Sequence, residues 1–555
     1  MIVMDDILTT LSVFWFSALV FYVLVHRGLW IFTDVTRTMS MFTLEKALGP
    51  GIDLVEGRKG AAPRAWIMQS VLWLFVGAIF TFEGLWLNHE PDALHALSSW
   101  GYNPTAETLS ATGEIVTLWG GIAMALIGSG MYVLPKLLGT DLASEKNATL
   151  VSFLWTFSIV VYMIGSQNSE ILGLDIMMIG TGINVIALLA VIMNQLLTLS
   201  NRSGSIPMPA WLIIFGLVSD PISLVAAALT GSLTTGAGQW LVYHMIGGGF
   251  FFLSTAGVVL YATTVVSGNA LWSRTLNGAI LIGGLFTINT FGDIDGSIAA
   301  AHLGLAAEEM VFSGGADVTA SFLLAMSAIP VVAFAANSLI TLRGGDALLE
   351  NYNGWSEINL GSLAIIPIFL ASLFLQTDAV TGTNAIGGMS STIETMALWA
   401  VMVPLSFGSA MALYPSITGR RLASMARARQ AFWLMSVGVL LGLMVTLMSD
   451  VIGMALMDAG VEDPSSLAHD LEVAGSVFFY FTVVAMILHC LNMVSGLFRG
   501  NIVEEESKTS SSIVVDTYDL ASATTVRRIL GSGAGMDTMV VPVGESDESG
   551  SATDL

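Results

Sequence analysis

The sequence predicts an all-α protein that crosses a membrane many times, and three observations lead to this fold class. Of its 555 residues, 54% are hydrophobic and only 11% are charged, which is too apolar for a soluble protein of this length. Apolar runs of roughly 17 to 30 residues, each long enough to cross a bilayer, recur along the chain. The basic residues, finally, are confined to alternate loops between these runs.

The apolar runs define 13 candidate membrane spans. Gly and Pro are frequent within them, as is usual where membrane helices pack closely. In order, the runs cover residues 7–33, 66–88, 112–135, 149–168, 173–199, 208–232, 240–266, 275–292, 318–342, 360–377, 395–415, 430–457 and 472–498.

The basic residues give the orientation of these spans. When the loops are numbered alternately, all 19 Lys and Arg residues fall on one side. Cytoplasmic loops of membrane proteins carry an excess of Lys and Arg, so this side is predicted to be cytoplasmic. The sequence therefore predicts a multi-pass protein of the cell membrane, with its N-terminus outside and its C-terminal tail in the cytoplasm.

Three regions follow along the chain. Residues 1–65 form an N-terminal transmembrane helix and a cytoplasmic linker, and the first apolar run lacks the basic flank and cleavage site of a signal peptide. Residues 66–500 form the main membrane domain. Residues 501–555 form an acidic tail, which begins with Glu504-Glu505-Glu506 and is predicted to be largely disordered because it is rich in Ser, Gly and acidic residues.

Charge and cysteine content exclude several classes of function. The net charge of -23, with only five Lys residues, suits a halophilic source, because molar salt screens repulsion between carboxylates. No basic patch is present, so nucleic-acid binding is not supported. The single cysteine, Cys490, excludes a disulfide framework and a thiolate metal cluster built by this chain alone.

An internal repeat identifies two helices that organise the fold. Glu, Trp, Pro and Gly occur at unchanged spacing at Glu114, Trp119, Pro135 and Gly139 and again at Glu394, Trp399, Pro415 and Gly419. Shared ancestry of the two helices and convergence on residues that favour close packing are the two interpretations. Because both helices start from the outer face, the repeat suits a ring with rotational pseudo-symmetry better than two inverted halves.

Four residues are candidates for chemistry. Glu114, Glu394 and His244 all begin helices that descend from the outer face, and together with Asp450 the two glutamates form a candidate relay for protons or ions. His244 is a candidate metal ligand, which the glutamates could complete if the helices are neighbours. The alternatives are that each glutamate caps its own helix and that His244 is an interfacial histidine bonded to a nearby carbonyl.

Three segments resemble subunit I of the haem-copper oxidase superfamily, which includes cytochrome oxidases and nitric oxide reductases. The segment 244–257 resembles the sixth core helix of that family, and the segments 131–139 and 412–420 resemble the ends of its second and tenth helices. The resemblance implies 12 core transmembrane helices in a pseudo-threefold ring, here with one extra N-terminal helix. It also implies a place in a respiratory chain, in electron transport, with oxygen or nitric oxide reduction as the family's activity.

The sequence departs from the family at the metal ligands. The resemblance places the low-spin haem histidine at Glu114 and the His-x-His pair at Ile393 and Thr395. The paired histidines of the seventh helix would fall near Asn289-Thr290-Phe291, so only His244 is retained. The usual haem and copper ligation is therefore not supported, and the cofactors are unknown.

Three hypotheses for the function remain open at this point. The first is a relative of subunit I that has lost its haem ligands and serves a respiratory or redox-associated complex, in contact with other membrane subunits, lipid or quinone. The second is a working terminal oxidase or nitric oxide reductase with atypical haem or metal ligation. The third is an independent transporter of ions or protons.

Overall fold

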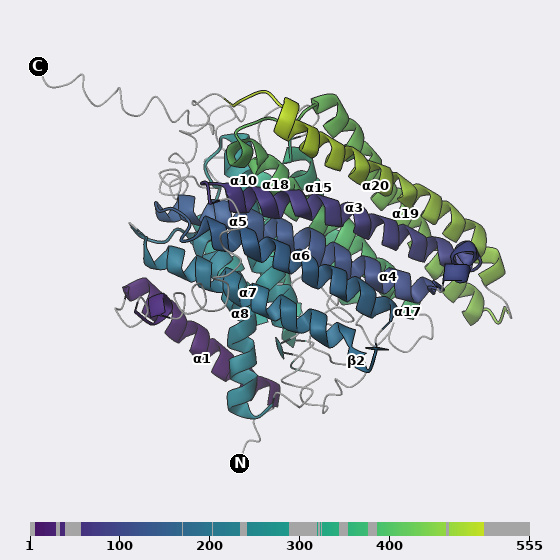
Figure 1. The fold of residues 1–555 in the computed structure, drawn as a ribbon. Coiled ribbons are helices and arrows are strands. Elements are labelled where there is room, and N and C mark those ends of the chain that lie inside the picture. Colours follow the sequence, from purple (N-terminus) through teal and green to yellow (C-terminus); the bar gives the residue numbers. More distant parts are fainter. Residues whose placement is uncertain are drawn as a thin grey trace, which may run out of the picture.

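The computed structural model is a bundle of long helices that run side by side (Figure 1). It describes residues 6–28, 34–38, 57–100, 102–168, 170–202, 204–232, 241–242, 244–287, 319, 322–323, 325–342, 353–375, 386–461 and 465–503. The predicted acidic tail lies outside the described residues from Glu504 onward.

Eleven of the described helices are long and apolar enough to cross a membrane, which confirms a polytopic all-α membrane protein. The uninterrupted ones are α1 (Asp6–Arg27), α3 (Ala61–His89), α6 (Glu145–Gln167), α7 (Ile176–Ser200), α8 (Met208–Thr230), α15 (Trp355–Leu375), α19 (Met425–Asp458) and α20 (Ser465–Arg499). Two further predicted spans correspond to the shorter helices α11 (Arg274–Thr287) and α14 (Ala328–Thr341). Between α6 and α7 lies a small antiparallel hairpin of β1 (Glu170–Ile171) and β2 (Leu174–Asp175).

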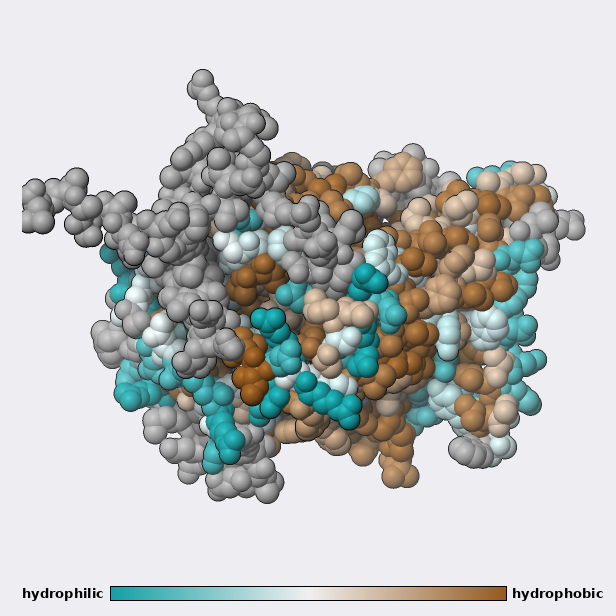
Figure 2. Space-filling model, turned by 90° about the horizontal axis from the view of Figure 1, so that it is seen from above, coloured by the Kyte–Doolittle hydropathy of each residue, from teal (hydrophilic) through white to brown (hydrophobic). Residues whose placement is uncertain are grey.

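Hydrophobic residues cover much of the face seen in Figure 2, and hydrophilic residues lie at its left and right margins and in a group near its centre. Large apolar side chains such as Phe16, Phe157 and Leu363 are more than half exposed on the outer helices. A soluble protein would bury such residues, whereas lipid tails solvate them. The surface therefore agrees with the apolar composition in indicating a membrane environment.

Three of the spans contain a π-helical segment. The first consists of α4 (Ala106–Ile115), η4 (Val116–Ile122) and α5 (Ala123–Leu138), and the second of η5 (Met245–Leu253) and α10 (Ser254–Ser267). The third consists of α17 (Ile386–Met396), η9 (Ala397–Met402) and α18 (Val403–Thr418). A π turn shifts the hydrogen-bond ladder and frees a carbonyl for another partner. In η4, the carbonyl of Trp119 accepts a bond of 2.8 Å from the Trp155 indole.

The sequence repeat corresponds to a repeat of structure. Helix α18 begins and ends 280 residues after α5, because Ala123–Leu138 is matched by Val403–Thr418. Both helices end at a glycine in the left-handed conformation, Gly139 with φ 63° and Gly419 with φ 70°. The two segments therefore share an α–π–α course in addition to their common residues.

The three π-containing spans are the inner helices of the bundle. Their most apolar windows are 94%, 89% and 100% buried, whereas no other span exceeds 67%. Helices α5, α10 and α18 pack against one another in all three pairs. Aromatic contacts fill the space between the π segments, since Trp119 of η4 lies 6.1 Å from Phe250 and 5.3 Å from Phe251 of η5, measured between ring centroids.

Each inner helix has a neighbour that approaches it closely at glycine residues. A Cβ atom at Gly257 of α10 would lie 2.8 Å from the Pro209 carbonyl oxygen of α8. A Cβ atom at Gly113 of α4 would lie 2.7 Å from the backbone nitrogen of Thr81 in α3, and Gly408 of α18 is packed in the same way against α15. Glycine is therefore required at these positions, because any side chain would push two backbones apart.

Substitution of a packing glycine should destabilise the bundle. We expect Gly257→Ala to lower the free energy of unfolding by about 1 to 3 kcal/mol, because the new methyl group overlaps the backbone of α8. Gly182→Ala is the matched control, since it also lies in a membrane helix but has no atom within 4 Å of its added methyl group. Thermal unfolding of the two variants in the same detergent makes the comparison, and equal midpoints would contradict it.

Candidate functional site

A cavity of about 370 Å³ brings together two of the three predicted relay carboxylates, Glu114 and Asp450. A third carboxylate, Glu472, lies in the same wall. We call this space the acidic cavity. It lies where the ends of α3 and α19 meet the starts of α4, α17 and α20, and its lining residues are Thr81, Leu85, Asn88, Ser110, Glu114, Ser391, Thr392, Thr395, Leu398, Leu443, Thr446, Asp450, Glu472 and Ser476.

Glu114 and Glu394 are not helix caps. Helix α4 begins at Ala106, and its cap is Thr105, whose hydroxyl accepts a bond of 3.2 Å from the backbone nitrogen of Thr108. Glu394 likewise lies inside α17, which begins at Ile386. The capping interpretation of both glutamates is therefore wrong, because the helices extend two turns further than the apolar pattern indicated.

Hydrogen bonds tie the carboxylates to three different helices. The Thr392 hydroxyl of α17 donates to Asp450 of α19 at 2.7 Å. The Ser449 hydroxyl of α19 lies 3.5 Å from the Glu472 carboxylate of α20, at the limit of a hydrogen bond. These bonds hold two of the acidic groups in place in the lining of the cavity.

The described lining of the acidic cavity is polar and acidic. Among the described residues that line it, none is Lys, Arg or His, while hydroxyl and amide groups are frequent. The buried hydroxyl of Thr81 has no hydrogen-bond partner. Carboxylates in such surroundings bind protons, cations or water, since an uncompensated charge inside a membrane is costly by about 2.5 to 3.5 kcal/mol.

The other two candidate residues lie apart from this lining. Glu394 is half-buried in α17, next to Thr395, and His244 is buried at the start of η5. Neither is among the residues that line the acidic cavity. Within the described part of the chain, no group of three or more His, Cys, Asp or Glu side chains is arranged to hold a metal ion.

Two positions that the resemblance assigns to haem ligands face the same cavity. Glu114 and Thr395 both line it, one from α4 and the other from α17. The third haem-ligand position is Ile393, which is buried. The segment 289–291, which the resemblance assigns with His244 to the copper or iron site, lies outside the described residues. The donor set of the cavity, carboxylate and hydroxyl without imidazole, does not fit the iron of a haem, which prefers nitrogen and sulfur ligands.

The repeated tryptophans and prolines have separate places. Trp119 and Trp399 are buried in the π segments, where Trp399 packs edge-on against Phe479 with centroids 5.7 Å apart. Pro135 and Pro415 line a second cavity at the opposite end of the bundle. The tryptophans thus fill the centre of the fold, while the prolines mark where the two repeated helices end.

Several buried polar residues were not found from the sequence. Glu357 of α15 is fully buried without a side-chain hydrogen-bond partner, and Asp220 of α8 is 7% exposed. His489 of α20 is fully buried and has no partner for either ring nitrogen, with its ring edge-on to Phe407. Asp220 could have been found from the sequence, because it is the only charged residue in the apolar run 208–232. Glu357 was missed because it falls just before the predicted run 360–377.

No protein-family model matches this chain, and no curated protein matches it. The function is therefore inferred from the geometry of the acidic cavity.

The acidic cavity should be accessible to water and small cations. We expect a cysteine placed by Thr395→Cys, in a Cys490→Ala background, to react with a small cationic methanethiosulfonate, because Thr395 lines the cavity. Ser406→Cys is the matched control, because Ser406 lies on the following helix of the same span and is fully buried outside the lining. Labelling is measured by mass spectrometry, and a Thr395→Cys variant that stays as unmodified as the buried Ser406→Cys control would show that the cavity is closed.

Proposed function

We propose that this multi-pass membrane protein conducts or exchanges protons or small monovalent cations through the acidic cavity, as a membrane subunit of a respiratory or redox-associated complex. The observation that carries the proposal is the grouping of Glu114, Asp450 and Glu472 in one cavity whose described lining is otherwise rich in hydroxyl groups and holds no Lys, Arg or His. Three carboxylates in one small polar space cannot all be ionised and uncompensated. Uptake of a proton or a cation is the direct way to balance them.

The chemistry follows from how the carboxylates are held. Asp450 accepts a bond from Thr392, so its second oxygen is free to take part in proton exchange with water in the cavity. Glu114 lines the same cavity from the inner helix α4, two residues before the π segment η4. Glu114 is thus the group that would pass a proton from the cavity toward the centre of the bundle.

The arrangement of the helices supports kinship with the haem-copper oxidase fold. We propose that the core consists of three groups of four helices, beginning at α3, α8 and α15, with α1 as the extra helix. In each group the second member contains a π segment and packs closely against the first, and the last two members pack against each other as α6 with α7, α11 with α14, and α19 with α20. The three inner helices then form the pseudo-threefold centre.

The proposed orientation places the acidic cavity toward the outside. Arg202, in the loop after α7, donates a bond of 2.8 Å to the Val25 carbonyl at the end of α1. Lys59 and Lys136 lie together at the end of the bundle opposite the acidic cavity. Because cytoplasmic loops are the basic ones, this end would face the cytoplasm.

A haem in the acidic cavity would meet unfavourable chemistry. Its propionates would add negative charge to a space that already holds three carboxylates and no described Lys or Arg. The alternative function, a terminal oxidase or nitric oxide reductase with atypical ligation, would require iron to bind carboxylate and hydroxyl groups there. An independent transporter would use the same carboxylates but would need no partner subunits.

Flux and spectra test the proposal together. The protein is purified from its native membrane with the subunits that stay bound, and proton and Na⁺ flux are measured in proteoliposomes. We expect Glu114→Gln to reduce the flux at least roughly tenfold, because the amide cannot carry a proton. Glu107→Gln is the matched control, since Glu107 lies on the same helix but is exposed and outside the cavity.

The outcomes separate the three hypotheses. Unchanged flux in Glu114→Gln would overturn conduction through the acidic cavity. Stoichiometric haem in a reduced-minus-oxidised spectrum, lost together with activity in the same variant, would favour the oxidoreductase. Full flux from the chain without any bound subunit would favour an independent transporter.

A further inference from the structure

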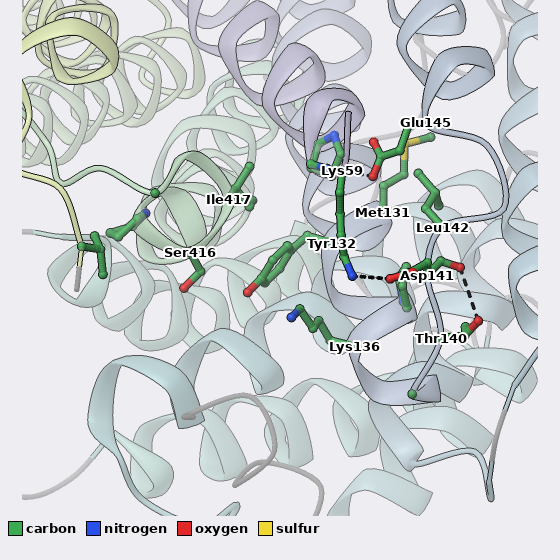
Figure 3. Close-up of a pocket in the computed structure, with 17 residues that line it drawn as sticks. Lys59, Met131, Tyr132, Lys136, Thr140, Asp141, Leu142, Glu145, Ser416 and Ile417 are labelled. Carbon is green, nitrogen blue, oxygen red and sulfur yellow. Dashed lines mark hydrogen bonds and ion pairs between the residues drawn. The ribbon is translucent and has the colours of Figure 1, made fainter. Parts of the chain in front are cut away.

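A second cavity lies at the other end of the bundle, where the two repeated helices finish. Its volume is about 560 Å³, and it is enclosed by the start of α3, the end of α5, the loop into α6 and the end of α18 (Figure 3). We call it the lysine cavity, because Lys59 and Lys136 both line it. Nothing in the proposed conduction through the acidic cavity uses this space.

The acidic groups in the wall of the lysine cavity already have partners. Asp141 forms an ion pair with Lys59. The Glu145 carboxylate accepts bonds from the backbone nitrogens of Gly60 at 2.8 Å and Ala62 at 3.0 Å, so it caps the start of α3. Neither carboxylate is therefore available to neutralise another cation in the cavity.

Lys136, the second lysine of the cavity, forms no ion pair among the described residues. Its ammonium lies 5.8 Å from the centre of the Tyr132 ring, and no carboxylate among the described residues lies within ion-pair distance of it. Figure 3 shows the Lys136 side chain and the Tyr132 hydroxyl directed into the same space, with Ser416 across from them. In a chain of net charge -23 with five Lys residues, a cavity whose partly buried lysine has no ion-pair partner among the described residues is unusual.

The polar groups around Lys136 come from both halves of the repeat. Lys136 on α5 and Ser416 on α18 occupy equivalent positions, 280 residues apart, one after each repeated proline. The pseudo-symmetric helix ends therefore present an ammonium from one side and a hydroxyl from the other. An ammonium together with two hydroxyl donors matches a phosphate, which offers several acceptor oxygens.

The remaining walls of the lysine cavity indicate which kind of molecule the phosphate belongs to. Met131, Leu142, Ile417 and Val503 give the cavity an apolar side next to its polar one. A small inorganic anion would leave this apolar surface in contact with water, whereas a lipid would cover it with its glycerol and upper chain. Basic pockets between membrane helices on the cytoplasmic side commonly hold phospholipid head groups.

We propose that the lysine cavity binds the phosphate of an anionic phospholipid head group. The Lys136 ammonium pairs with the phosphate, the hydroxyls of Tyr132 and Ser416 donate hydrogen bonds to it, and the apolar wall covers the glycerol region. Bound in this way, the lipid would link the ends of α5 and α18.

The chain itself offers a competing ligand. Val503 is held beside the cavity by a bond of 3.0 Å from its backbone nitrogen to the Gly419 carbonyl. The next three residues in the sequence are Glu504, Glu505 and Glu506. The test must therefore distinguish a lipid from these carboxylates as well as from free phosphate.

Native mass spectrometry of the full-length protein measures retained lipid after exchange into vesicle-derived nanodiscs of phosphatidylglycerol or phosphatidylcholine. We expect the wild type to retain phosphatidylglycerol preferentially and Lys136→Gln to retain at least roughly fivefold less, because the charge-assisted contacts are lost. Lys136→Arg should restore most of the retention. Lys146→Gln is the matched control, since Lys146 lies in the adjoining helix start outside the cavity lining.

Three results would overturn the proposal. The first is equal retention in the wild type and Lys136→Gln. The second is loss of retention at millimolar inorganic phosphate together with equal thermal stabilisation by phosphate alone, which would assign the cavity to a soluble anion. The third is retention only after replacement of Glu504, Glu505 and Glu506 by Gln, which would make the tail the natural occupant.

Discussion

Close contact between helices at glycine residues is the constraint on which this structure depends. Lipid tails are as apolar as Leu, so the hydrophobic effect does not drive helices together inside a membrane, and tight packing must do so instead. At Gly113, Gly257 and Gly408 the backbones of paired helices approach until a Cβ atom would overlap the neighbouring chain. These contacts place three π-containing spans at the centre of the bundle and leave the other helices around them. Both cavities lie where this packing ends, one at each end of the inner helices.

The π segments connect the packing to the chemistry. A π turn places an extra residue in the helix, which redirects the side chains on either side of it, and such turns are frequent at functional sites. Here Glu114 lies two residues before η4 and Thr395 lies two residues before η9, and both line the acidic cavity. The cavity thus presents carboxylate and hydroxyl groups at these two positions, and such groups suit protons, water and small cations better than they suit the iron of a haem.

Much of the fold could be predicted from the sequence, because membrane helices are specified locally by apolar length. All 13 predicted runs have a matching helix among the described residues, and the repeat of Glu114 to Gly139 at Glu394 to Gly419 corresponds to matched helix courses. The site was only partly predictable. Glu114 and Asp450 were identified because charge within an apolar run is conspicuous, but Glu472 lies at the edge of a run and joins them only through the packing of α19 against α20. The π-containing span of η5 and α10 lacks the Glu, Trp and Pro of the repeat. Only its burial and position therefore show that it is equivalent to the two repeated spans.

The central claim is that the acidic cavity holds water or a small cation in place of a haem. A cryo-electron microscopy map of the protein purified from its native membrane, at a resolution that shows ordered water, tests this claim most directly. The account predicts compact, water-sized density between Glu114 and Asp450, and no planar density between Glu114 and Thr395. A disc of macrocycle density with a strong central peak in that space would contradict it.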